Sequence, residues 1–248
     1  MLRKIATSLM TGGLIFTPLV QADSHMEAQY VPAHINACTF RDGKGWSDLE
    51  ALNEAFLGYI GDEPTDYSYW ILTPRFREST DMHFGWLGSW NSGEGFGAGF
   101  DGWAADGGEV QQMFYETAEC GSNMVAIAPI SADPEDPPTN GVVWFSRCTL
   151  DDDASMEDAM KAHAEGSAAM RELGVEAQSW AFVPTLGFGD AKFDYYHVAA
   201  FDSYADLGNG FDANFNKGGW KARMEPMEGV VSCASPNLYD FRIKLQGQ

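Results

Sequence analysis

Basic residues are scarce in this sequence. Its 248 residues contain 15 lysines and arginines against 36 aspartates and glutamates, which gives a formal net charge of −21. Nucleic acid and anionic membrane surfaces repel such a chain, so we expect neither as a partner. The excess of acids indicates a well-solvated surface, because net charge governs solubility and association rather than fold.

The sequence also lacks the short motifs that mark common catalytic and metal sites. It contains no C-x-x-C, and no cysteine has a histidine at the spacing of a zinc site. It contains no G-x-S-x-G, no H-E-x-x-H and no glycine-rich phosphate loop. The common hydrolase mechanisms and nucleotide binding are therefore without support, and we expect no metal ion and no cofactor.

Beyond the N-terminus, no uncharged apolar run approaches the roughly 20 residues of a membrane span. Residues 1–22 carry Arg3 and Lys4, then an apolar stretch, then Val20-Gln21-Ala22. This pattern is typical of a secretory signal peptide that is cleaved after Ala22. We expect a periplasmic or secreted protein that has no membrane attachment after cleavage.

Only four cysteines are present. An even number in a chain bound for an oxidising compartment predicts disulfides, and four cysteines allow three pairings, between which composition cannot choose. The cysteines are Cys38, Cys120, Cys148 and Cys233.

An internal repeat is visible, with matched positions about 110 residues apart. The matched pairs are Cys38 with Cys148, Trp70 with Trp180, Pro74 with Pro184, His83 with His197, Phe100 with Phe211, and Cys120 with Cys233. Between the copies, residues 131–140 are rich in proline and acids, which indicates a linker. We therefore predict a first repeat over 23–130 and a second over 141–248.

Each repeat has the order strand, helix, strand, strand, helix, strand, which is the βαββαβ pattern of a ferredoxin-like module. We predict strands near 31–40, 68–76, 81–89 and 121–130 with helices near 47–60 and 93–116, then strands near 141–149, 178–186, 194–202 and 233–243 with helices near 155–173 and 204–224. In that topology the first and last strands are antiparallel neighbours. Topology and repeat symmetry together predict the pairs Cys38–Cys120 and Cys148–Cys233.

The predicted strands are apolar on both faces, whereas a lone ferredoxin-like sheet leaves one face to water. The sheet of the other copy is the simplest cover for the second face. Two such sheets packed face to face in an α+β protein resemble the dimeric α+β barrel superfamily, here with both halves in one chain. The resemblance implies relatives that include cofactor-independent monooxygenases, small-molecule isomerases and haem enzymes, but no catalytic motif accompanies it.

Histidines are the best candidates for chemistry. His83 and His197 are matched on a strand that is central in this topology, where a histidine beside an apolar pocket could act as a general base. A structural hydrogen-bond network is the alternative. On the neighbouring strand, His34 and Asn36 share a face and have no counterparts in the second repeat, so a site there would be one-sided.

We expect any ligand to lie between the two sheets, and four further side chains are candidates to line that space. They are Trp70, Trp180, Ser89 and Ser203. The glycine-rich segment 93–99 is costly inside a helix, which indicates either close packing or a mobile gate.

Three functions are consistent with these observations. The first is the binding of a small hydrophobic or aromatic molecule between the sheets. The second is a cofactor-independent monooxygenase or isomerase with a strand histidine as base. The third is a structural or interaction protein with a solid core. The sequence leaves the oligomeric state open.

Overall fold

The computed structural model describes residues 29–78, 81–133 and 137–247. The predicted signal peptide, residues 1–22, lies outside the described residues, as does the middle of the predicted linker, residues 134–136. No helix in the described ranges is long and apolar enough to cross a membrane.

The predicted elements are present in the predicted order, except that the strand predicted near 233–243 is divided into β8 and β9. The first half comprises β1 (Val31–Phe40), α1 (Trp46–Ile60), β2 (Tyr67–Phe76), β3 (Phe84–Trp90), α2 (Gly93–Asp106), α3 (Gly108–Thr117) and β4 (Ala118–Pro129). The second half comprises β5 (Asn140–Leu150), α4 (Met156–Glu172), β6 (Gln178–Leu186), β7 (Tyr195–Phe201), α5 (Tyr204–Asn216), α6 (Gly219–Met224), β8 (Val231–Cys233) and β9 (Asn237–Leu245).

The second predicted helix of each half is divided into two shorter helices in the structure. Gly107 separates α2 from α3, and a Cβ at this position would lie 2.6 Å from the carbonyl oxygen of Trp103. Gly218 separates α5 from α6 with a φ of +82°, a conformation that glycine adopts without steric cost.

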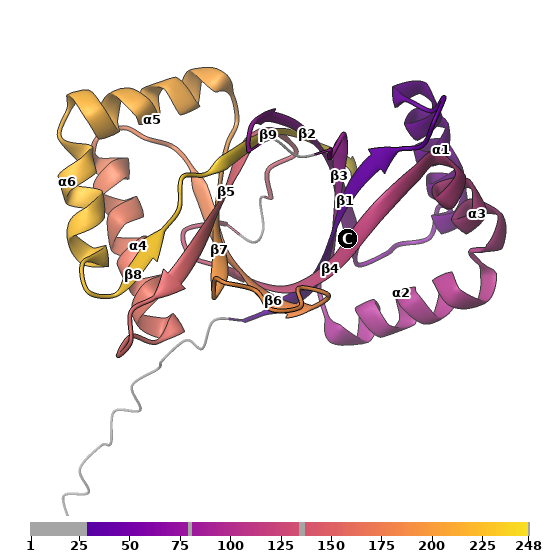
Figure 1. Ribbon diagram of the computed structural model, residues 1–248, viewed down its shortest axis with the longest axis horizontal. Helices are drawn as coiled ribbons and strands as arrows, with labels where there is room; N and C mark the ends of the chain where they lie inside the picture. The colour runs from indigo at the N-terminus through magenta and orange to yellow at the C-terminus, as the bar shows by residue number, and fades with distance from the viewer. Residues whose placement is uncertain (1–28, 79–80, 134–136, 248) are drawn as a thin grey trace, which may run out of the picture.

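The strands form one antiparallel sheet that closes into a barrel. Their order is β7-β6-β4-β1-β3-β2-β9-β5, and pairing of β5 with β7 completes the ring, while β8 pairs with β5. Figure 1 looks along the barrel, with α1, α2 and α3 on one side and α4, α5 and α6 on the other. The α+β class and the barrel are as predicted.

The barrel interior is a core that the two halves share. Ala33 and Val125 from the first half pack in one cluster with Phe182, Val198 and Phe241 from the second. Strand residues alternate between the two faces of a sheet, so the remaining residues of each strand point outward to the helices. Both faces of the sheet are therefore covered, as the apolar strands indicated.

Both predicted disulfides are present. Cys38 lies directly opposite Cys120 in the pairing of β1 with β4, and their sulfurs are bonded. Cys148 lies opposite Cys233 in the pairing of β5 with β8, and these sulfurs are also bonded.

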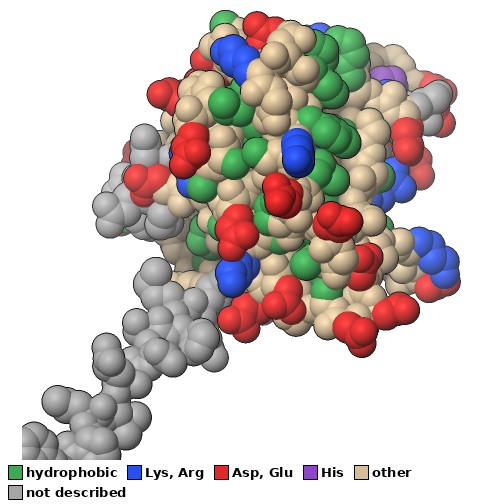
Figure 2. Space-filling view, turned by 90° about the vertical axis from the view of Figure 1, so that its left-hand side faces the viewer, with side chains coloured by type: hydrophobic (Ala, Val, Ile, Leu, Met, Phe, Trp, Pro, Cys, Tyr) green, Lys and Arg blue, Asp and Glu red, His purple; other side chains and the backbone are tan. Residues whose placement is uncertain are grey.

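Figure 2 shows the side of the molecule that carries α4 to α6, where acidic and hydrophobic side chains are interspersed.

Candidate ligand-binding site

A cavity of about 1370 Å³ lies on the helix side of the first half. Strands β1 to β4 form its floor, and helices α1, α2 and α3 form its walls. This cavity therefore does not lie between the two sheets, where we expected a ligand. Trp70 and Trp180 point into the barrel instead and pack against its apolar core.

The cavity is strongly aromatic. Its aromatic lining side chains are Phe56, Tyr59, Tyr67, Trp86, Trp90, Phe96, Phe100, Trp103, Phe114 and Tyr115. Many of these rings contact one another edge to face, as Trp103 does with Phe56 and Tyr59. The volume exceeds the roughly 300–1,000 Å³ of a typical small-molecule site, so a ligand with several fused rings can enter.

Polar groups gather on the cavity floor. Alternation along β1 places His34 and Asn36 on the helix side, so both line the cavity. Trp86 donates its Nε1 hydrogen to the Tyr67 hydroxyl at 3.1 Å, and that hydroxyl lies 2.9 Å from Nε2 of His34. Because the Tyr67 hydroxyl accepts a hydrogen bond from Trp86, we assign its own hydrogen as the donor in the bond to Nε2 of His34. His34 then carries its proton on Nδ1.

Burial fixes the charge state of this floor. It lowers the pKa of His34 to about 4, so the imidazole is neutral at pH 7. Burial also raises the pKa of the Tyr67 hydroxyl far above its ordinary value, although the hydrogen bond from Trp86 opposes that rise. The floor therefore offers hydrogen bonds without a net charge. The Oδ1 atom of Asn36 is buried and has no hydrogen-bond partner among the described residues.

The glycine-rich segment brings α2 close to the floor. A Cβ on Gly95 would lie 1.7 Å from a carboxylate oxygen of Asp66, and a Cβ on Gly99 would lie 2.8 Å from Nε1 of Trp90. Ser92 caps the helix by accepting the backbone N–H of Gly95. Of the two interpretations of this segment, these contacts favour close packing.

In the second half, an aromatic side chain fills the position that matches the cavity floor. Cys38 faces Phe84, and Cys148 faces Tyr195, so Trp144 occupies the place of His34. Trp144 packs edge to face on Phe201 at 5.1 Å within a hydrophobic cluster. The sequence predicted that a site at His34 and Asn36 would be present in the first repeat alone. The cavity lies in that same half.

The same register corrects the predicted match of His83 with His197. Residue 83 corresponds to Asp194, because each precedes the residue that faces the first cysteine of its half. The two side chains have equivalent partners, since Nδ1 of His83 accepts the N–H of Phe40 and the Asp194 carboxylate accepts that of Leu150. His83 is exposed and stacks on Phe40, outside the cavity.

His197 belongs to a different cluster, behind the sheet of the second half. Its ring stacks on that of His163 at 4.0 Å with an interplanar angle of 5°. Nε2 of His163 bonds to the Tyr195 hydroxyl at 2.8 Å, while Nδ1 of His163 and Nε2 of His197 are buried without a partner among the described residues. Sequence analysis did not identify His163, because it lies on α4 and is distant in the sequence from His197.

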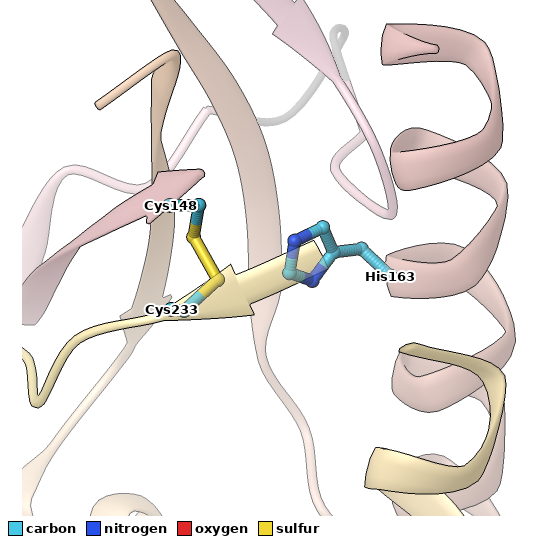
Figure 3. A group of neighbouring side chains, drawn as sticks. All are labelled: Cys148, His163 and Cys233. Carbon is cyan, nitrogen blue, oxygen red and sulfur yellow. A yellow bond between two sulfur atoms is a disulfide. The ribbon is translucent and has the colours of Figure 1, made fainter. Parts of the chain in front are cut away.

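His163 also lies beside a disulfide (Figure 3). Its ring nitrogen and the sulfurs of Cys148 and Cys233 lie within 4.8 Å of one another, a spacing compatible with a metal ion. The two sulfurs are bonded to each other, as Figure 3 shows, so the thiolates that a metal needs are absent in this state.

The remaining predicted ligand contacts lie elsewhere. Ser89 faces the barrel interior, opposite Ala33 of β1. Ser203 caps α5 by accepting the N–H of Asp206. Trp70 donates its Nε1 hydrogen to the carbonyl of Pro138. Of the predicted ligand-binding residues, the cavity brings together His34 and Asn36 alone.

Comparisons with known proteins identify the fold. No protein-family model matches the sequence, and no curated protein matches it. A candidate monooxygenase from Fusobacterium nucleatum superposes with a TM-score of 0.55 at 9% identity, covering 90% of this chain and 96% of that one. A candidate chlorite dismutase gives 0.52 at 11% identity, covering 87% and 95%. An anthrone oxidase-like protein gives 0.51 at 13% identity, covering 90% and 98%.

These neighbours span nearly the whole of the described chain and share its barrel. The chain has the fold of a dimeric α+β barrel, as the sequence pattern predicted. Identities of this size establish the fold alone, so function has to be argued from the cavity.

Proposed function

We propose that this protein binds a flat, apolar molecule with several aromatic rings in the cavity between β1–β4 and helices α1–α3. The observation that carries the proposal is the combination of a large aromatic cavity with one small hydrogen-bonding floor. Such sites are mostly apolar, with a few polar groups that orient the ligand. In this cavity the imidazole of His34 and the amide of Asn36 supply the polar groups.

The low basicity of His34 favours a binding function over catalysis. A cofactor-independent oxygenation, of the kind that the names of the anthrone oxidase-like and monooxygenase neighbours suggest, starts with removal of a substrate proton. A histidine whose pKa is about 4 is a weak base, and each pKa unit between base and substrate costs about 1.4 kcal/mol. Proton transfer from a weakly acidic carbon or phenol is therefore unfavourable at this residue.

The proposal also covers the internal duplication of the chain and its export from the cell. Residues 23–130 and 141–248 are two copies of one ferredoxin-like module, joined by a linker at 131–140. One copy keeps an open cavity, and in the other Trp144 takes the place of His34. Residues 1–22 direct export to the periplasm or the exterior, where both disulfides can form. The repeated element order and the one-sided cavity support this view.

Titration calorimetry with acridine, a flat three-ring molecule, tests the binding function. We expect saturable binding to the wild-type protein. Ala98→Phe should weaken it at least tenfold, because Ala98 lines the cavity and the new ring would occupy it. Ala104, an exposed alanine of the same helix that does not line the cavity, gives the matched control Ala104→Phe.

Loss of binding in Ala98→Phe but not in Ala104→Phe would support the proposal. Equal binding by both variants would place acridine elsewhere on the protein. No binding by the wild type, with its fold intact by circular dichroism, would overturn the proposal. Turnover of an aromatic substrate that survives His34→Gln would remove His34 as a catalytic base.

A further inference from the structure

The charges around the cavity are all of one sign. Asp66 and Asp106 are the charged side chains among the described residues that line it, and no lysine or arginine does. Asp66 precedes β2, and Asp106 is the last residue of α2. Asp106 is exposed and Asp66 is partly exposed, so we take the side of the cavity that carries these two carboxylates as its entrance.

The field of Asp106 reaches the aromatic wall. The pKa of Tyr59 is raised, first by burial and then by the negative charge of Asp106. Asp66 lies over the first turn of α2, against Gly95, and accepts a hydrogen bond from Ser92 at 3.3 Å. The neutral His34 adds no positive charge to offset the two carboxylates.

The aromatic walls, like the two carboxylates, favour a cationic ligand. The faces of tryptophan, tyrosine and phenylalanine rings attract cations, and they do so more strongly when the cation is desolvated. Trp86, Trp90 and Trp103 line the cavity beside seven other rings. A cationic ligand would therefore meet favourable electrostatics at both the entrance and the wall.

Anionic ligands fit this site poorly. Haem, which some members of the superfamily bind, carries carboxylate groups, and the cavity lining offers them two aspartates and no basic partner among the described residues. The one imidazole on the floor, His34, has its Nε2 engaged by Tyr67 and, in the preferred tautomer, a proton on Nδ1. The lining of this cavity does not fit haem.

We propose that the ligand of this cavity is a flat aromatic cation, selected by Asp66 and Asp106 at the entrance and by the aromatic walls. This inference rests on the proposed binding function and narrows it to one charge class. Discrimination comes from the two carboxylates, which attract a cation and repel an anion of the same shape.

Three probes of matched shape and different charge test the inference. They are 9-aminoacridine, a cation at neutral pH, acridine, which is neutral, and anthracene-9-carboxylate, an anion. Affinities are measured by calorimetry at low salt, where exposed charges are least screened. We expect the cation to bind at least tenfold more tightly than the anion, on the order expected for two charges several ångströms away at intermediate dielectric.

Neutralising variants then locate the source of the preference. Asp66→Asn and Asp106→Asn should each reduce the ratio of cation to anion affinity by about threefold to tenfold. Asp101→Asn is the matched control, because Asp101 is an exposed acid of α2 that does not line the cavity. The control changes the net charge by the same amount but removes a carboxylate that does not line the cavity. It should therefore keep the wild-type ratio of cation to anion affinity within about twofold.

Each outcome has a distinct meaning. Equal affinities for the three probes, or preference for the anion, would overturn the charge inference and leave the binding function intact. Equal effects of all three variants would assign the preference to net charge, which also overturns the inference. Failure of every probe to bind would overturn the proposed function itself.

Discussion

Nε2 of His34 and the hydroxyl oxygen of Tyr67 lie 2.9 Å apart directly over Gly88 of β3. A Cβ at position 88 would lie 2.1 Å from that nitrogen and 2.2 Å from that oxygen. The absence of a side chain at one strand position therefore permits the hydrogen bond that sets the polarity of the cavity floor.

Gly88→Ala should separate His34 from Tyr67 and destabilise the protein by about 1–3 kcal/mol, the usual cost of overpacking a core. Gly121→Ala is the matched control, because a Cβ on this β4 glycine has nothing within 4 Å. Urea unfolding of both variants measures the difference. Equal stabilities would show that the floor relaxes around an added methyl group.

Tyr67→Phe should cost about 1–3 kcal/mol, because it leaves Nε1 of Trp86 and Nε2 of His34 buried without their shared partner. Tyr115 is an exposed tyrosine whose hydroxyl lies outside this hydrogen-bond chain, so Tyr115→Phe should change stability by less than about 0.5 kcal/mol. Urea unfolding compares the two. A neutral Tyr67→Phe would contradict the hydrogen-bond chain.

Acid should destabilise the second half through its stacked histidines. The pKa of His163 is lowered to about 4 by burial and by the charge of Arg223, and that of His197 is lowered by burial, by His163 and by Arg223. Both stay neutral in the folded state but gain protons near pH 6.5 when unfolded. The free energy of unfolding should therefore fall below pH 6.5, by about 1.4 kcal/mol per pH unit for each histidine.

His163→Gln isolates this effect, because glutamine cannot titrate yet can still hydrogen-bond to Tyr195. Between pH 6 and pH 5 the slope of unfolding free energy against pH should become shallower by about 1.4 kcal/mol per unit. Denaturant unfolding at a series of pH values measures it. An unchanged slope would show that His163 is protonated equally in the folded and unfolded states.

Each disulfide should contribute comparable stability, since Cys38–Cys120 and Cys148–Cys233 close loops of similar length, with sequence separations of 82 and 85. On the chain-entropy model, replacing either pair by serines should cost about 4.5 kcal/mol. Peptide mapping without reduction checks the pairing, and denaturant unfolding checks the cost. A peptide that joins Cys38 to Cys148 would contradict the structure.

The sequence sufficed for the elements, the barrel and the disulfides, because those follow from hydrophobic periodicity and from repeat symmetry. The sequence did not predict the position of the cavity. Strands that are apolar on both faces do not show which face is closely packed and which borders a cavity. The histidine match was wrong because His83 and His197 share a residue type but not a register. Phe84, Trp86 and Trp90 alternate along β3 and face the helices, and this spacing was the one available signal for the aromatic wall.

Side-chain indole signals of the eight tryptophans test the central claim most directly. Acridine is added to uniformly nitrogen-15-labelled protein, and each indole N–H is assigned by single substitution. The account predicts shifts at Trp86, Trp90 and Trp103, which line the cavity, and none at Trp70 and Trp180, which face the barrel interior. Shifts confined to Trp70 and Trp180 would place the ligand between the sheets and contradict the account.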